Sequence, residues 1–199
     1  MLKLARTIAI KQRFVTLEKE ADQIFEQRSF EGSLEKYRGI IDDFVQTGVI
    51  NQSDIERIYL QIGLCLSGLG RFREALDYYA KYTNKTHTIW YNMGNAHRSL
   101  HEHSEALECY DKSIALDPSY SNAWNSKGGV FLDQRKSTQA LECFTKAGTH
   151  ANALCNKGKV LYHLGEVDEA IMSLNLSLVL VPDNISAIPW LINSYIGLR

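Results

Sequence analysis

Four glycines of this chain are each followed by an alanine twelve residues later, and this spacing recurs along most of the sequence. The pairs are Gly63 with Ala75, Gly94 with Ala106, Gly128 with Ala140 and Gly158 with Ala170, and the glycines lie 31, 34 and 30 residues apart. Self-similarity with a period of roughly 20–50 residues is the signature of stacked structural repeats. The sequence therefore predicts a repeat array.

A weaker unit precedes these four, and a fragment of one follows them. In the upstream unit Ala21 replaces the glycine and Ser33 the alanine, and the two are again twelve residues apart. The fragment near the end contains Ile188, Leu191, Ile192 and Tyr195. Together they extend the predicted array over nearly the whole chain.

The apolar residues inside each unit have helical spacing. Ala106, Leu107, Tyr110 and Ile114 form one stripe of a helix. Short turns such as Leu69-Gly70-Arg71 separate the two halves of a unit, and no stretch alternates as a strand does. Each unit is thus predicted to be a pair of antiparallel helices. The small residues let the pair approach closely, and stacking on neighbouring pairs buries the large ones.

The unit from His87 to Tyr120 resembles the tetratricopeptide repeat family. Its matching residues are Trp90, Met93, Gly94, Ala106, Tyr110 and Pro118, with His97 in place of the usual tyrosine. The resemblance covers about residues 14–199. It implies an all-α, right-handed α-solenoid of about five helical hairpins and a C-terminal helix.

This register divides the chain into seven segments. We expect a basic helical extension at 1–13, a degenerate first unit with its connection at 14–55, units at 56–86, 87–120 and 151–184, a shortened unit at 121–150, and a terminal helix at 185–199. The extension is read as the basic start of a helix, with an organelle-transit signal as the alternative.

Composition excludes several classes of protein. The chain has 22 basic and 23 acidic residues and a net charge of −1, so it lacks the basic footprint of a nucleic-acid binder. Its longest apolar run is too short to cross a membrane. The four cysteines form no CxxC pair and have apolar neighbours, which predicts buried, reduced thiols and a cytoplasmic protein.

By the family resemblance, the first helices of the repeats line a concave groove that binds a peptide. The groove residues we expect to contact it are Asn92, Asn95, Arg98, Asn122, Asn125, Asn156 and Lys159. Amides both donate and accept, so they would hold the partner's backbone, whereas Arg98 and Lys159 would prefer an acidic side chain. The alternative is that these are solvated helix residues.

The family's carboxylate clamp for acidic chaperone tails is not supported. Asn95 fits one of its places, but Tyr91 stands where a lysine is needed and Ser126 where the next asparagine is needed.

The sequence gives no reason to expect an enzyme, a cofactor or a metal. His97, His101 and His103 form an H-x3-H-x-H run, yet His97 falls in a packing column and the other two in a turn. No phosphate-binding glycine loop or nucleophile motif occurs. We interpret the histidines as packing and surface residues, with a metal site as the weaker alternative.

The end of the chain is unusually apolar for the end of an array. Four residues are candidates for self-association: Trp190, Leu191, Tyr195 and Leu198. The segment fits a chain cut from a longer array, a homodimer or a surface covered by a partner. The sequence thus predicts a non-catalytic adaptor that binds a segment of another protein. The alternative is a structural assembly subunit that self-associates through its terminal helix.

Overall fold

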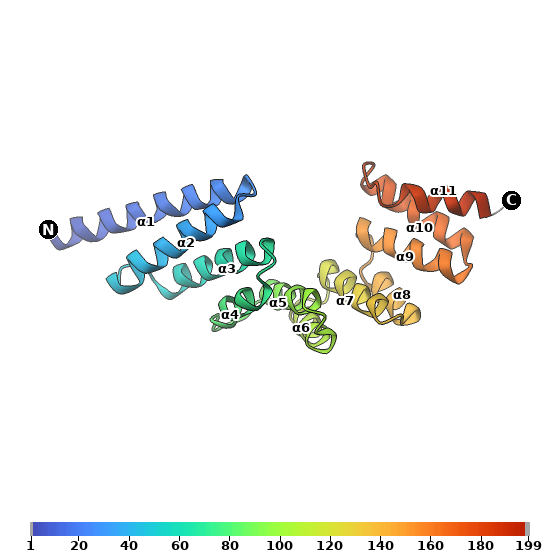
Figure 1. Ribbon diagram of the computed structural model, residues 1–199, viewed down its shortest axis with the longest axis horizontal. Coiled ribbons are helices and arrows are strands. Elements are labelled where there is room, and N and C mark those ends of the chain that lie inside the picture. Colours follow the sequence, from blue (N-terminus) through green and yellow to red (C-terminus); the bar gives the residue numbers. More distant parts are fainter. Residues whose placement is uncertain (1, 198–199) are drawn as a thin grey trace. The chain divides into compact units, whose positions relative to one another are not determined.

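The computed structural model describes residues 2–197, except for the side chains of Leu2, Lys3 and Gln46. Within these residues the regular structure is entirely helical (Figure 1). The helices are α1 (Leu2–Glu26), α2 (Phe30–Phe44), the short 3₁₀ helix η1 (Val45–Thr47), α3 (Gln52–Gly68), α4 (Phe72–Ala80), α5 (His87–Ser99), α6 (His103–Leu116), α7 (Ser121–Asp133), α8 (Ser137–Lys146), α9 (Ala151–Leu164), α10 (Val167–Leu180) and α11 (Ile188–Gly197). The predicted all-α fold is confirmed.

The chain divides into two compact units, residues 1–85 and 86–199. The first unit contains the hairpins α1/α2 and α3/α4, and the second contains α5/α6, α7/α8 and α9/α10, followed by α11. In the second unit the first helices α5, α7, α9 and α11 contact one another in order. They form one layer, which the second helices α6, α8 and α10 cover.

The repeated glycines make room for a large side chain of the facing helix. A Cβ atom on Gly94 would lie 2.6 Å from the ring of Tyr110, and one on Gly128 would lie 2.6 Å from the ring of Phe144. Tyr110 and Phe144 are fully buried. The small residue therefore lets the hairpin close by leaving space for the residue sixteen positions later.

These buried rings also join one hairpin to the next. Tyr110 packs in one cluster with Val130 of α7, and Phe144 packs in another with Val160 of α9. A single hairpin leaves these side chains uncovered, so the repeats stabilise one another.

The long connection after α2 has local causes in the sequence. Gly48 follows η1 with a φ of 63°, which a glycine adopts without strain. Asn51 then caps α3: its side chain accepts a hydrogen bond from the Asp54 backbone N–H at 2.9 Å, and Asp54 accepts one from the Asn51 N–H at 3.3 Å. In the N-terminal part, α1 continues without a break from Leu2 to Glu26, through the expected boundary at residue 13.

Candidate functional site

All seven predicted groove residues lie on three neighbouring first helices of the second unit. Asn92, Asn95 and Arg98 are on α5, Asn122 and Asn125 are on α7, and Asn156 and Lys159 are on α9. Each is half-buried. Because α5, α7 and α9 contact one another in order, these side chains belong to one layer of the unit.

Two of the asparagines are joined across neighbouring helices. Asn156 on α9 donates from Nδ2 to Oδ1 of Asn125 on α7 at 3.0 Å. On α5, the Oδ1 atom of Asn95 accepts a hydrogen bond from the Tyr110 hydroxyl at 2.7 Å. A primary amide has two donor hydrogens and two acceptor lone pairs, so one bond leaves capacity for others. The amides are held in place and keep groups free for a peptide backbone.

Arg98 is already paired with a carboxylate from the next repeat. Its Nε and Nη2 atoms donate to Asp133 at 2.7 and 3.3 Å. Its guanidinium lies against Gly129, where a Cβ would come within 2.6 Å of Nη1. The sequence offered Arg98 as a site for an acidic side chain of the partner, but the structure gives its charge an internal partner.

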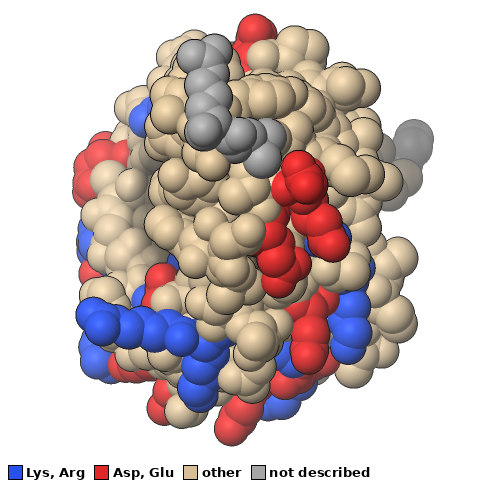
Figure 2. Space-filling view, turned by 90° about the vertical axis from the view of Figure 1, so that its right-hand side faces the viewer, with Lys and Arg blue, Asp and Glu red and all other residues tan. Residues whose placement is uncertain are grey.

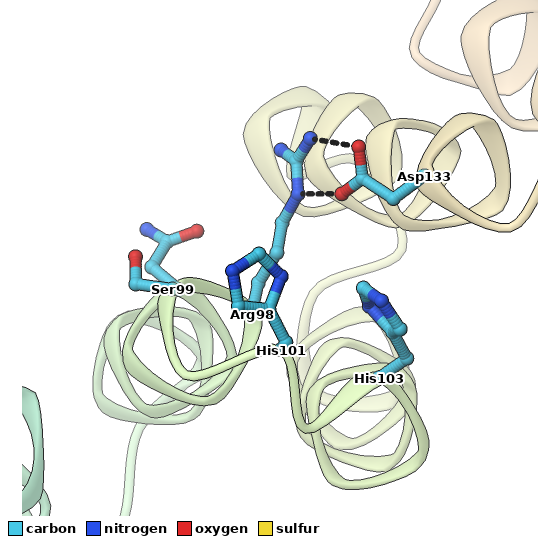
Figure 3. A pocket seen from close by; sticks show the side chains of 6 residues that line it. Arg98, Ser99, His101, His103 and Asp133 are labelled. Atoms are coloured by element: carbon cyan, nitrogen blue, oxygen red, sulfur yellow. Dashed lines mark hydrogen bonds and ion pairs between the residues drawn. The ribbon is translucent and has the colours of Figure 1, made fainter.

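Arg98 and Asp133 border a pocket of about 520 Å3 whose other lining residues are Asn95, Ser99, His101 and His103 (Figure 3). Sequence reasoning missed Asp133 and Ser99. The Gly128-Gly129 pair carried a signal, since only the first glycine belongs to the repeat pattern and the second makes room for Arg98. The pocket is polar and contains both signs of charge.

The three histidines have separate environments. The Nδ1 atom of His97 lies 2.7 Å from Oε2 of Glu102, and its side chain is 18% exposed. His101 lies in the α5–α6 turn with a φ of 60°, and its ring centroid is 6.1 Å from that of His103. In the part of the chain that the structure describes, no three His, Cys, Asp or Glu side chains are grouped to hold a metal ion.

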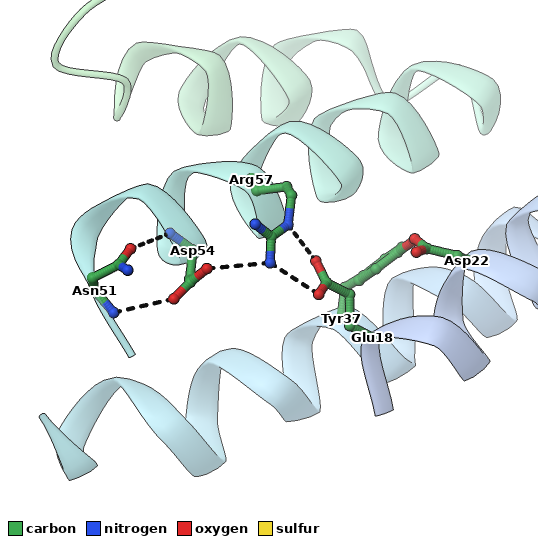
Figure 4. Close-up of polar contacts among 6 residues, drawn as sticks. All are labelled: Glu18, Asp22, Tyr37, Asn51, Asp54 and Arg57. Atoms are coloured by element: carbon green, nitrogen blue, oxygen red, sulfur yellow. Dashed lines mark hydrogen bonds and ion pairs between the residues drawn. The ribbon is translucent and has the colours of Figure 1, made fainter. Parts of the chain in front are cut away.

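A charged network in the first unit repeats the neutralisation seen at Arg98 (Figure 4). Arg57 on α3 donates to both carboxylate oxygens of Glu18 on α1, at 2.5 and 2.9 Å, and also pairs with Asp54 at 3.2 Å. The hydrogen bond to Glu18 raises the pKa of Arg57. Nearby, the buried Tyr37 donates its hydroxyl to Asp22. Both arginines therefore serve to connect successive first helices.

The predicted buried, reduced cysteines are confirmed: Cys65, Cys109, Cys143 and Cys155 are all free and buried. Burial raises the pKa of Cys65 to about 12 and that of Cys109 to about 11. Such thiols hold almost no thiolate at neutral pH, so they lack the character of a catalytic nucleophile.

Two of the four candidate self-association residues turn toward the core instead. Trp190 and Leu191 pack against the buried cluster of Cys155, Leu174 and Ala187. The ring of Trp190 also meets that of His163 at 5.0 Å. Tyr195 is 51% exposed, whereas Leu198 lies outside the described residues. The contact with α9 and α10 selects the buried face of α11 and leaves another face exposed.

Comparison with protein families identifies the repeat. The tetratricopeptide repeat matches residues 87–120 in one form of its sequence and residues 56–84 and 151–184 in a second form. The chain belongs to the tetratricopeptide repeat family. The matched segments of this tetratricopeptide repeat protein correspond to the hairpins α3/α4, α5/α6 and α9/α10. Repeats of this family generally mediate contacts between proteins and are typically non-catalytic.

Known proteins share this fold at low sequence identity. A STIP1 homolog of Dictyostelium discoideum is 30% identical over 101 residues, which are 49% of this chain and 18% of that protein. The solved structure of the anaphase-promoting complex heterotetramer Cut9–Hcn1 has a TM-score of 0.72, 18% identity, and coverage of 94% of this chain and 37% of that one. The first tetratricopeptide repeat domain of Spaghetti (RPAP3), bound to the HSP90 peptide SRMEEVD, has a TM-score of 0.54, 20% identity, and coverage of 57% and 93%.

The chain spans less than a fifth of the length of the curated relatives it matches. Among the described residues, no helix combines the length and the apolar character needed to cross a bilayer.

Proposed function

We propose that this chain is a non-catalytic adaptor that binds a peptide segment of another protein along α5, α7 and α9. The observation that carries the proposal is the hydrogen bond between Asn125 and Asn156, with Asn92, Asn95 and Asn122 in the same layer. This arrangement offers half-buried amides that are fixed in place and have unused donors and acceptors. A peptide backbone presents donors and acceptors that match them.

The comparisons support this class of function. The RPAP3 domain, which shares the fold, is bound to a peptide of HSP90. In the present chain the peptide need not be acidic, because Arg98 is paired with Asp133 and Arg57 with Glu18. The buried thiols agree with a reducing, cytoplasmic setting, and the net charge of −1 does not favour nucleic acid as the partner.

The proposal is tested with peptides selected from a random twelve-residue library on the full chain. The best peptide is titrated against the wild type and against Asn92→Ala combined with Asn156→Ala. Each lost hydrogen bond costs about 0.5–1.5 kcal/mol, so the double variant should bind roughly tenfold more weakly. The matched control is Glu108→Ala combined with Glu142→Ala, on the exposed faces of α6 and α8, which should bind as the wild type does.

Equal affinity of the asparagine variant and the wild type would refute the proposal, and so would a library that yields no binding peptide. Helical content measured by circular dichroism must stay unchanged in both variants, so that weaker binding reports the surface and not unfolding.

A further inference from the structure

The fourth matched position on the outer face of the second helices breaks a charge pattern kept by the three repeats before it. Fourteen and eighteen residues after the repeat glycine, those repeats carry an exposed acid and an exposed lysine. The pairs are Asp77 with Lys81, Glu108 with Lys112, and Glu142 with Lys146. In α10 the same two positions hold Met172 and Leu176, which are 71% and 41% exposed.

The lysines of the earlier pairs have a structural role that α10 lacks. Lys112 lies 4.5 Å from the ring centroid of Trp90, and Lys146 lies 4.9 Å from that of Trp124. In the last repeat Leu154 takes the place of the aromatic residue and is buried. The apolar face of α10 is therefore a change specific to this repeat, and the cation–π pair has been lost with it.

A following repeat would not cover this face. Glu108 and Glu142 are exposed although further repeats follow each of them, so these positions point away from the neighbouring hairpins. The apolar residues at the same positions of α10 consequently need cover from outside the array. A contiguous exposed apolar surface is typical of a protein–protein contact.

The exposed face of α11 continues the apolar surface of α10. On α10 the stripe consists of Met172, Leu176, Val179 and Leu180, and on α11 it consists of Ile188, Ile192, Tyr195 and Ile196. The two stripes have the same helical spacing, and the two helices contact each other. Figure 2 views the molecule from the side of these C-terminal helices, where a broad area lacks charged residues.

We propose that the outer faces of α10 and α11 form the interface of a two-fold homodimer. An uncharged surface is its own complement, which an isologous contact requires. The identical spacing lets α10 of one copy pack against α11 of the other, ridge into groove. If a large apolar residue offers roughly 150–200 Å2 in full, these half-exposed side chains reach about the 800 Å2 that each partner contributes to a standard interface. This surface lies on other helix faces than the proposed peptide site, and its occupant is a second copy.

Sedimentation velocity between about 1 and 100 µM tests the dimer. The wild type should shift from the 22.6 kDa monomer to twice that mass as its concentration rises. Met172→Glu combined with Leu176→Lys restores the pair that α6 and α8 carry, so the helix tolerates it, and it should raise the dissociation constant at least tenfold. Ile192→Lys should do the same from α11. The matched control is the charge reversal Glu108→Lys with Lys112→Glu on α6, which should dimerise as the wild type does.

Three results would overturn the dimer. The wild type could remain monomeric at 100 µM, both interface variants could dimerise normally, or the mass could rise beyond that of two copies, as in an open-ended assembly. A monomeric wild type that captures a different protein through Met172 and Leu176 would likewise assign the surface to another partner. The peptide titration above is unaffected by any of these outcomes, so the two proposals fail separately.

Discussion

Arg98 on α5 donates two hydrogen bonds to the carboxylate of Asp133 on α7, from Nε at 2.7 Å and from Nη2 at 3.3 Å. The pair joins two repeats and borders the polar pocket at the end of α5. An arginine in this state has its charge satisfied before any partner arrives. The preference for an acidic peptide that Arg98 alone would give is therefore masked by Asp133.

Removing the carboxylate should expose that preference. Asp133→Asn should bind a selected peptide that contains glutamate about two- to fivefold more tightly than the wild type does, and should leave a matched peptide with glutamine unchanged. The magnitude follows from the roughly 0.2–1 kcal/mol of an exposed ion pair. Fluorescence anisotropy with both peptides measures it. Asp43→Asn, which breaks the exposed pair with Arg13 in the first unit, serves as the control. Identical affinity for both peptides in Asp133→Asn would contradict the masking.

The bond between Asn125 and Asn156 should contribute to stability as well as to binding. Each single change to alanine should lower the free energy of unfolding, and the double change should cost less than the sum of the two. We expect a coupling energy of about 0.5–1.5 kcal/mol, typical of one hydrogen bond. Urea denaturation of the four proteins gives this value. Additive costs would show that the bond is absent in solution.

The space beside the repeat glycines predicts opposite effects of one substitution at two helical sites of the first unit. A Cβ on Gly63 would collide with the ring of Tyr79, whereas one on Gly39 would have no atom within 4 Å. Gly63→Ala should therefore destabilise by about 1–3 kcal/mol. Gly39→Ala should stabilise by up to about 1 kcal/mol, because alanine favours the helix. Urea denaturation followed by circular dichroism compares them, and the same sign for both would refute this account of the packing.

The repeat fold was predictable because it depends on spacing within single hairpins. Helix geometry and a short turn fix which residue faces Gly94, and that residue is Tyr110 sixteen positions later. The pattern is written locally and then repeated, so four copies in one register reinforce one another. The same logic placed the cysteines in buried columns.

Contacts between repeats were not predictable in the same way. Arg98 and Asp133 lie 35 positions apart, and neither position belongs to the conserved spacing of the hairpin. The terminal helix is apolar nearly all round, so its sequence leaves the docked face open. The buried Ala187 and Ser194 mark the face that approaches the preceding repeat, which turns Trp190 inward and leaves Ile192 and Tyr195 exposed.

Alkaline pH should destabilise the chain through its buried thiols. Unfolded cysteines titrate near pH 8.5, whereas burial raises the pKa of Cys65 to about 12 and that of Cys109 to about 11. The folded chain therefore retains protons that the unfolded chain loses. The stability that this gives is complete below about pH 8.5 and declines as pH rises toward the folded pKa values. The free energy of unfolding, measured in urea with a reducing agent, should be lower at pH 9.5 than at pH 7.5.

A matched variant separates the thiols from the other groups that titrate at high pH. Cys65→Ala combined with Cys109→Ala should lose less stability than the wild type between pH 7.5 and 9.5, although it starts from a lower value because two buried side chains are truncated. Burial also raises the pKa of Tyr79 to about 12, but an unfolded tyrosine titrates near 10, so its contribution falls mostly above this window. An equal pH dependence in the variant and the wild type would show that the thiols are not the cause.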